Sequence, residues 1–239
     1  MDLFIATLSL AASYLLGSIS FARIIVRRWT GKDVADFEVA VDGTDEKYKA
    51  VSIGGNTVST LLGAKGGITV GTLDILKVVL PTLAFRLLYP EQSSYMLIAA
   101  IGGVTGHIWP IYYQFHGGAG YSAILGGLLV IDWLAVLITP IAGLLLGMVV
   151  FRNMIVASLS WLWLLVPWFW WQTEGNLAYI LYAVVVNILF LLAMIPEYQT
   201  AMKYKKEGKY INYGLGTLKA NPMGRGMLKI AKFFKVEIK

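Results

Sequence analysis

Apolar runs long enough to cross a bilayer recur along this chain, and they limit its fold more than any other feature of the sequence. A membrane-spanning helix needs about 17–25 mostly apolar residues. Apolar residues make up 57% of the chain and charged residues only 14%, which leaves too little polar surface for a water-soluble globule. We predict an all-α integral membrane protein with helices at 3–26, 68–89, 95–114, 118–131, 133–151, 154–171 and 177–196.

The number of spans depends on the region from 118 to 151. This region is too long for one helix and carries Asp132 near its middle, so dividing it there gives seven spans, whereas keeping it whole gives six. Basic residues that flank spans stay in the cytoplasm. The segment 27–67 holds six Lys and Arg, and the chain beyond residue 197 holds ten. Both lie on one side only if the count is odd, so we predict about seven transmembrane helices with the N-terminus outside.

Two cytoplasmic segments accompany the polytopic membrane domain, which we assign to 1–199. Within the insertion 27–67, residues 37–53 alternate apolar and polar side chains around DGTDE, a pattern typical of a β-hairpin. This hairpin could cap a cleft or dock a soluble partner, or it could be a solvated insertion with no role. The second segment is the basic tail, 200–239.

The tail carries an amphipathic pattern between residues 226 and 236. Met227, Ile230, Ala231 and Phe234 recur at helical spacing, with lysines opposite them. Such a helix binds the surface of a membrane that contains anionic lipids. Lipid attraction accounts for the net charge of +6, and we expect no nucleic-acid partner.

The scarcity of cysteine and histidine narrows the possible chemistry. The chain has no cysteine and only two histidines, His107 and His116. The lack of cysteine excludes disulfides and thiolate nucleophiles. Two histidines are too few to build a metal site from histidine alone. We expect neither a metal nor a cofactor.

Two glycine-rich stretches are candidate binding elements. FHGGAG, at 115–120, runs directly into an apolar segment, and glycine at a helix start lets backbone N–H groups approach an anion. It contains no Lys or Arg, so any phosphate cradle there needs a cation from elsewhere. SIGGNTVSTLLGAKGG, at 52–67, offers Asn56, Thr60 and Lys65, although ordinary loops share this composition.

Polar residues within the predicted spans form a second set of candidates. Ser18, at the end of the first span, could offer its hydroxyl to a ligand or make a small-residue contact between helices. Asp74 and Lys77 lie three residues apart in the second span. Intramembrane charges are functional by default, but two residues at this spacing could also simply neutralise each other.

The predicted topology places the insertion, the FHGGAG loop and the FRN turn at Arg152 on the cytoplasmic face. A cleft at this surface could receive one water-soluble and one lipid-soluble substrate.

Several motifs, taken in order, resemble one family. They are GSISF at 17–21, GGNTVST at 54–60, LGAKGGITVGTLDILK at 62–77, GHIWPIYYQFHGGAG at 106–120, and the Arg152 turn with Ala157-Ser158. They resemble GSIPFG, GSGNPGATN, LGKKAG…DLLKG, GHxFPxFxxFKGGKGVAT and RYxSxAS of the bacterial acyl-phosphate:glycerol-3-phosphate acyltransferases, the PlsY family. The resemblance covers about residues 11 to 200.

The resemblance implies seven helices, a cytoplasmic site, and transfer of a fatty acyl group from acyl phosphate to glycerol 3-phosphate, giving lysophosphatidic acid. As catalytic residues we take His107, Ser18 and Asn56. As substrate-binding residues we take Thr60, Lys65, Lys77, His116, Gly117, Gly118, Gly120, Arg152 and Ser158.

The sequence departs from the family pattern where phosphate contacts belong. The lysines of KGGKG are His116 and Ala119 here, and the arginine expected two residues after Asp33 is Ala35. The Asn-Ile pair expected beyond the last span is replaced by Ala201 and Met202. Each lost cation removes a contact worth about 1.5–3 kcal/mol. His116 binds an anion only when protonated, so binding through it would weaken as the pH rises.

Three hypotheses remain open. The first, which we favour, is an acyltransferase of the inner (plasma) membrane in which Arg152, Lys77 or Lys65 and His116 replace the missing cations. Its partners would be acyl phosphate and glycerol 3-phosphate as substrates, with anionic lipids around it. The second is a non-catalytic relative that binds lipid or a partner protein. The third is a small-solute transporter, against which the lack of a detectable internal repeat argues.

Overall fold

The fold comes from a computed structural model, which describes residues 1–40, 45, 47–208, 218–219 and 222–236. The longer helices are α1 (Leu3–Gly17), α2 (Phe21–Thr30), α3 (Gly55–Leu88), α4 (Ser94–Ile108), α5 (Tyr121–Ile131), α6 (Trp133–Leu145), α7 (Met154–Trp163), α8 (Leu165–Gln172), α9 (Leu177–Lys206) and α11 (Pro222–Phe233). Short helical turns are η1 (Val34–Asp36), η2 (Ile111–Tyr113) and η3 (Leu146–Val150).

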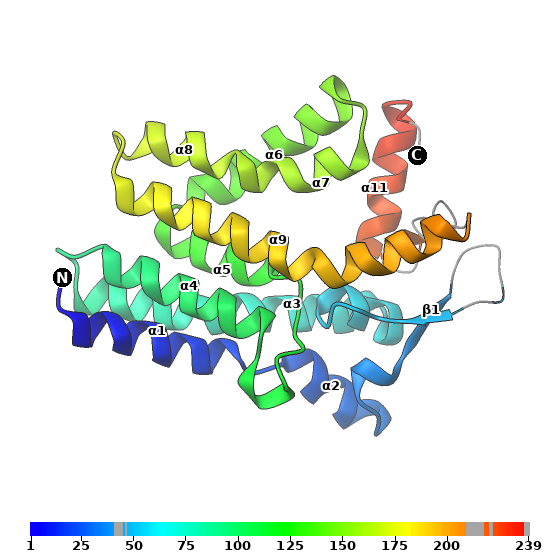
Figure 1. Ribbon diagram of the computed structural model, residues 1–239, viewed down its shortest axis with the longest axis horizontal. Coiled ribbons are helices and arrows are strands. Elements are labelled where there is room, and N and C mark those ends of the chain that lie inside the picture. The colour runs from blue at the N-terminus through cyan, green and yellow to red at the C-terminus, as the bar shows by residue number, and fades with distance from the viewer. Residues whose placement is uncertain (41–44, 46, 209–217, 220–221, 237–239) are drawn as a thin grey trace.

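The helices form a bundle whose main members run side by side (Figure 1). Helix α4 packs against α1, α3, α5 and α9, while α6 packs against α7 and α8 against α9. The main apolar core lies between α3, α4, α5, α7, α8 and α9, and includes the fully buried Leu128, Phe169 and Tyr182. Helix α2 turns away from the direction of α1 (Figure 1) and packs against α3, where Ala22 and Val26 are buried.

The predicted integral membrane character fits the helix lengths. Among the described residues, five helical segments are long and apolar enough to span a bilayer: Leu3–Thr30, Gly55–Leu88, Ser94–Tyr113, Trp133–Val150 and Leu177–Lys206. Helix α5 is apolar but shorter, and the count of seven spans stays a prediction.

The helix breaks at Asp132, where the sequence suggested a division. The Asp132 carboxylate caps α6 by accepting hydrogen bonds from the N–H groups of Leu134 at 2.9 Å and Ala135 at 3.3 Å. Its other oxygen accepts a hydrogen bond from the Trp168 indole at 2.7 Å. A side-chain acceptor for otherwise unpaired N–H groups is what starts a new helix here.

Three of the expected spans differ from the helices of the structure. The first expected span, 3–26, is interrupted between α1 and α2 around Ile19. Helix α3 begins at Gly55 rather than at 68, and a kink at Gly63, with φ +75°, separates its first turns from the rest. The expected helix 154–171 is divided between α7 and α8 at Leu164.

The insertion contains two short strands, β1 (Glu38–Ala40) and β2 (Lys47–Lys49). They pair antiparallel, with Val39 opposite Tyr48. Residues 41–44 and 46 of the expected hairpin lie outside the described residues.

The tail helix α11 packs partly against the bundle, and its expected contact with the lipid surface stays a prediction. Ala231 is buried in a cluster with Met148 of η3 and Ala157 of α7, and Ile230 and Phe234 pack partly against the same cluster. Part of the apolar face of α11 is therefore covered by protein. Helix α9 also continues to Lys206, past the domain boundary expected at 199.

Small residues let α1 and α4 approach closely. A Cβ atom added at Gly106 would overlap the Tyr14 carbonyl oxygen, and one added at Gly102 would lie 2.6 Å from the Leu10 carbonyl oxygen. Close contact of this kind through glycine is a common way for helices to associate in membranes. It fixes the end of α4, which carries His107.

Replacing Gly106 with alanine is expected to destabilise the protein, because the new Cβ would force α1 and α4 apart. Overpacking of this kind costs about 1–3 kcal/mol, and a lower melting temperature of the detergent-solubilised protein would report it. Gly71→Ala is the matched control, since a Cβ there meets no atom of the described chain within 4 Å. Equal melting temperatures for the two variants would contradict this account of the packing.

Candidate functional site

A narrow polar recess lies where the end of α1 meets α3, α4 and the glycine loop 115–120. About 180 Å³ of space lies between its walls, part of it open to the surroundings. Its walls are Gly17, Ser18, Ile19, Ser20, Ile53, Asp74, Lys77, His107, Pro110 and Gly118. These residues come from distant parts of the sequence, so only the folded chain brings them together.

A buried ion pair forms the floor of the recess. The Lys77 Nζ lies 2.9 Å from an Asp74 carboxylate oxygen, and the two side chains are only 5% and 2% exposed. Lys77 also donates a hydrogen bond to the Ile19 carbonyl at 2.7 Å. The pair therefore neutralises itself, as one of the two interpretations of the sequence held, and it also lines the recess.

His107 lies beside this pair. Its Nδ1 is 3.7 Å from the Asp74 carboxylate, too far for a hydrogen bond. This Nδ1 is buried and has no hydrogen-bond partner among the residues that the structure describes. Buried polar atoms are normally paired, so the unpaired nitrogen of this recess-lining residue is a candidate contact for a ligand.

The glycine loop covers His107. The Gly118 N–H donates to the His107 carbonyl at 3.1 Å, and the Gly117 carbonyl accepts from the Ile53 N–H at 3.0 Å. A side chain at Gly117 would overlap the His107 carbonyl oxygen, and one at Gly118 would overlap the imidazole. The Gly118 N–H is thus used within the protein, and both glycines serve close packing rather than only the approach of a ligand.

Ser18 lies in the recess with its hydroxyl engaged. It donates to the Tyr14 carbonyl at 2.8 Å and accepts the Ile111 N–H at 3.4 Å. Ser18 therefore holds the loop after α4 against the end of α1. Gly120, with φ +98°, stands at the start of α5 in a conformation that favours glycine.

Other residues predicted for the site lie outside the recess walls. Asn56, on the first turn of α3, and Lys65, just past the kink at Gly63, are exposed, and Thr60 donates to the Asn56 carbonyl at 3.2 Å. Arg152 is exposed in the turn before α7. The Ser158 carbonyl accepts from the Tyr121 hydroxyl at 3.4 Å.

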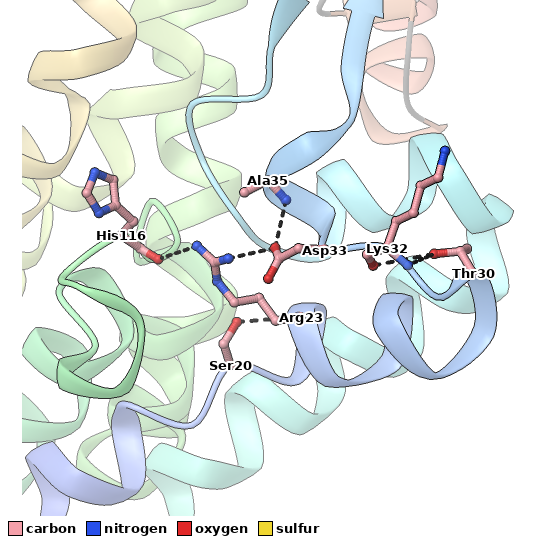
Figure 2. Close-up of polar contacts among 7 residues, drawn as sticks. All are labelled: Ser20, Arg23, Thr30, Lys32, Asp33, Ala35 and His116. Carbon is pink, nitrogen blue, oxygen red and sulfur yellow. Dashed lines mark hydrogen bonds and ion pairs between the residues drawn. The ribbon is translucent and has the colours of Figure 1, made fainter.

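The His116 imidazole is exposed and points away from Arg23 (Figure 2). Its Nδ1 lies 2.6 Å from the Gln114 carbonyl. The backbone of His116, rather than its ring, contacts its neighbours on α2.

The sequence analysis missed Arg23, which lies next to the wall residue Ser20 (Figure 2). Its guanidinium lies 2.6 Å from the Asp33 carboxylate and donates to the His116 carbonyl at 3.3 Å. It also lies 5.2 Å from the centre of the Tyr113 ring. The only available signal was the arginine itself, because its partners are ten and 93 residues away.

The Arg23–Asp33 pair stays charged at neutral pH. Partial burial by itself would raise the pKa of the Asp33 carboxyl, but the hydrogen bond from the Ala35 N–H and the nearby Arg23 outweigh it, so the pKa is lowered. A lowered pKa means that the pair's contribution to stability is present above the ordinary carboxyl range and is lost only as the pH falls through the lowered value.

Asp74→Asn is expected to destabilise the protein strongly, because Lys77 would stay buried without its counter-charge. Removing one partner of a buried pair costs about 3–5 kcal/mol. The double variant Asp74→Asn/Lys77→Met removes both charges and should recover much of the loss, as measured by thermal unfolding in detergent. Asp36→Asn, at an exposed carboxylate, is the control. A double variant no more stable than Asp74→Asn alone would refute this view of the pair.

Comparison with known proteins agrees with the fold and the order of these elements. Residues 7–206 match the model of a family described as glycerol-3-phosphate acyltransferase. A glycerol-3-phosphate acyltransferase of Halalkalibacterium halodurans is 31% identical over 60% of this chain and 61% of its own length. One from Mycoplasmopsis synoviae is 27% identical over 81% of this chain and 92% of its own.

A solved structure also superimposes on the chain. A crystal structure of PlsY (YgiH), an integral membrane glycerol 3-phosphate acyltransferase in its glycerol 3-phosphate form, matches with a TM-score of 0.66 and 22% identity. The match covers 85% of this chain and 93% of that one, and it shows a shared fold. From the family match over most of its length, this chain belongs to the glycerol-3-phosphate acyltransferase family.

Proposed function

We propose that this chain is a membrane acyltransferase that transfers a fatty acyl group from acyl phosphate to glycerol 3-phosphate in phospholipid synthesis. One observation carries the proposal. The fold gathers Ser18, Lys77, His107 and Gly118 around a single recess, and these residues match family motifs in three separate segments of the chain.

The reaction needs little covalent help from the protein. The 1-hydroxyl oxygen of glycerol 3-phosphate bonds to the acyl carbonyl carbon, and the bond from that carbon to the phosphate oxygen breaks. Inorganic phosphate leaves with the electron pair, and the hydroxyl proton passes to a base. Because acyl phosphate has a good leaving group, positioning and charge stabilisation supply most of the rate.

His107 is the proposed base. It lines the recess, and its Nδ1 has no partner among the described side chains and backbone groups. A positioned base contributes about 10²–10⁴-fold to rate. Ser18 and Lys77 would hold the walls in place. Asn56, Thr60, Lys65, Arg152 and Ser158, which lie outside the walls, would contact parts of the substrates that extend beyond the recess.

The membrane arrangement forms part of the proposal. Five of the seven crossings are the longer segments. Helix α5 is the sixth, and α7 and α8 together form the seventh. The N-terminus then lies outside, and the recess and the β1–β2 pair face the cytoplasm of the plasma membrane. Lys229 and Lys232 on α11 would meet anionic lipids of the inner leaflet.

The activity is tested with purified protein in lipid, supplied with palmitoyl phosphate and labelled glycerol 3-phosphate. Lysophosphatidic acid and inorganic phosphate should form in equal amounts. His107→Ala should reduce kcat by about 10² or more, while Glu91→Gln, at an exposed residue beyond α3, should act like the unmodified protein.

Acyl-CoA and acyl-carrier-protein donors are tested in parallel. Product from either of these but not from acyl phosphate would change the proposed donor. No product with any donor, from protein with a normal melting temperature, would overturn the proposal in favour of a non-catalytic relative that binds lipid or a partner.

A further inference from the structure

The recess lacks a free cation on its floor. Lys77 is buried, and its ammonium is already held by Asp74 and the Ile19 carbonyl. A phosphate group in this region therefore needs its positive charge from another side chain. Lys65 and Arg152 are exposed and, like Arg23, stand outside the recess walls, but in the described part of the chain neither of them has a hydrogen bond to a wall residue.

Arg23 is the cation that the fold brings to the edge of the recess. The backbone of Arg23 lies next to the recess wall, because its N–H donates a hydrogen bond at 3.5 Å to the hydroxyl of Ser20, which is a wall residue. Its side chain then reaches the glycine loop through the His116 carbonyl (Figure 2). The guanidinium thus lies between α2 and the loop that covers His107.

The donors of Arg23 are only partly used. A guanidinium carries five N–H groups, and the contacts to Asp33 and His116 each involve a different terminal nitrogen. The Nε is buried and has no acceptor in the described part of the chain. A buried donor without an acceptor is unfavourable, and it indicates a group that binds here and completes the pairing.

The contacts of Arg23 also reach two of the three positions, His116 and Ala35, where the family resemblance expects a cation that this chain lacks. One contact is to the backbone of His116 itself. The other is to the Asp33 oxygen that also accepts the Ala35 N–H at 2.9 Å. A single arginine on α2 therefore lies beside both of these positions.

We propose that Arg23 binds a substrate phosphate group at the edge of the recess. The inference rests on the proposed acyltransferase function, and the phosphate could belong to glycerol 3-phosphate or to acyl phosphate. Asp33 holds one guanidinium nitrogen and so orients the other donors. A phosphate oxygen displaces the neutral His116 carbonyl, because a hydrogen bond between two charged groups is shorter and stronger than one to a neutral carbonyl.

The test compares four variants by KM for each substrate separately. Arg23→Gln should raise KM for one of the two substrates by about 10–100-fold, the loss expected for one charged hydrogen bond. Arg23→Lys, which keeps the charge but not the planar fork, should recover part of the loss. Arg28→Gln, at an exposed arginine on the same helix, controls for net charge and should stay within about twofold.

Asp33→Asn distinguishes binding from mere support of the loop. It breaks the ion pair but leaves the Arg23 charge in place. If Arg23 binds phosphate, Asp33→Asn should weaken binding far less than Arg23→Gln does. If the two variants lose affinity equally, Arg23 only holds the loop and the proposal is wrong. Should Arg23→Gln fail to fold, Arg23→Lys takes its place. A larger loss of affinity in Arg23→Lys than in Asp33→Asn would then support the proposal, and an equal loss would overturn it.

A binding measurement separates this inference from the proposed activity. Glycerol 3-phosphate and inorganic phosphate are titrated into the purified protein by calorimetry, with no turnover required. Binding that Arg23→Gln abolishes and Arg28→Gln keeps would support the inference even if no product forms. If Arg23→Gln binds both ligands with the same affinity as the unmodified protein, the inference is wrong, whether or not the protein forms product.

Discussion

The buried pair of Asp74 and Lys77 is the interaction on which the rest of the site depends. Two charges are stable in the interior only if they are paired and hydrogen-bonded, and Lys77 meets both conditions through Asp74 and the Ile19 carbonyl. That carbonyl follows the last turn of α1, where the helix dipole is negative. The ammonium therefore fixes the point at which α1 gives way to α2. This turn determines the direction of α2 and hence the place of Arg23.

The opposite wall depends on close backbone packing. Gly106 lets α4 approach α1, and the Tyr14 hydroxyl donates to the Trp109 carbonyl at 2.9 Å just beyond α4. His107 lies between these two contacts, so its ring has little freedom to move. Gly117 and Gly118 then press against it without side chains of their own. Glycine in this loop is explained by the shape of the histidine beneath it.

The sequence predicted the parts of the fold that depend on local composition. Apolar runs located most helices, and Asp132 marked a break because a carboxylate caps the helix that follows. The start of α3 at Gly55 was not predictable, since glycine-rich residues become helical only when they pack against neighbours. In the site, Ser18, Lys77 and His107 were identified and do come together. Arg23 was missed because its partners lie far away in the sequence, and bends between α1, α2 and η1 bring them together.

The size of the recess constrains how a substrate could use it. The walls of the recess lie close together, and the space between them, about 180 Å³, includes a part that is open to the surroundings. A space this narrow cannot hold a fatty chain, so in the proposed reaction the chain would lie along the apolar helix surfaces. A phosphate dianion is also unfavourable next to Asp74, whose charge only Lys77 offsets. The proposed division follows from these two limits: proton transfer at His107 inside the recess, and phosphate binding by Arg23 at its edge.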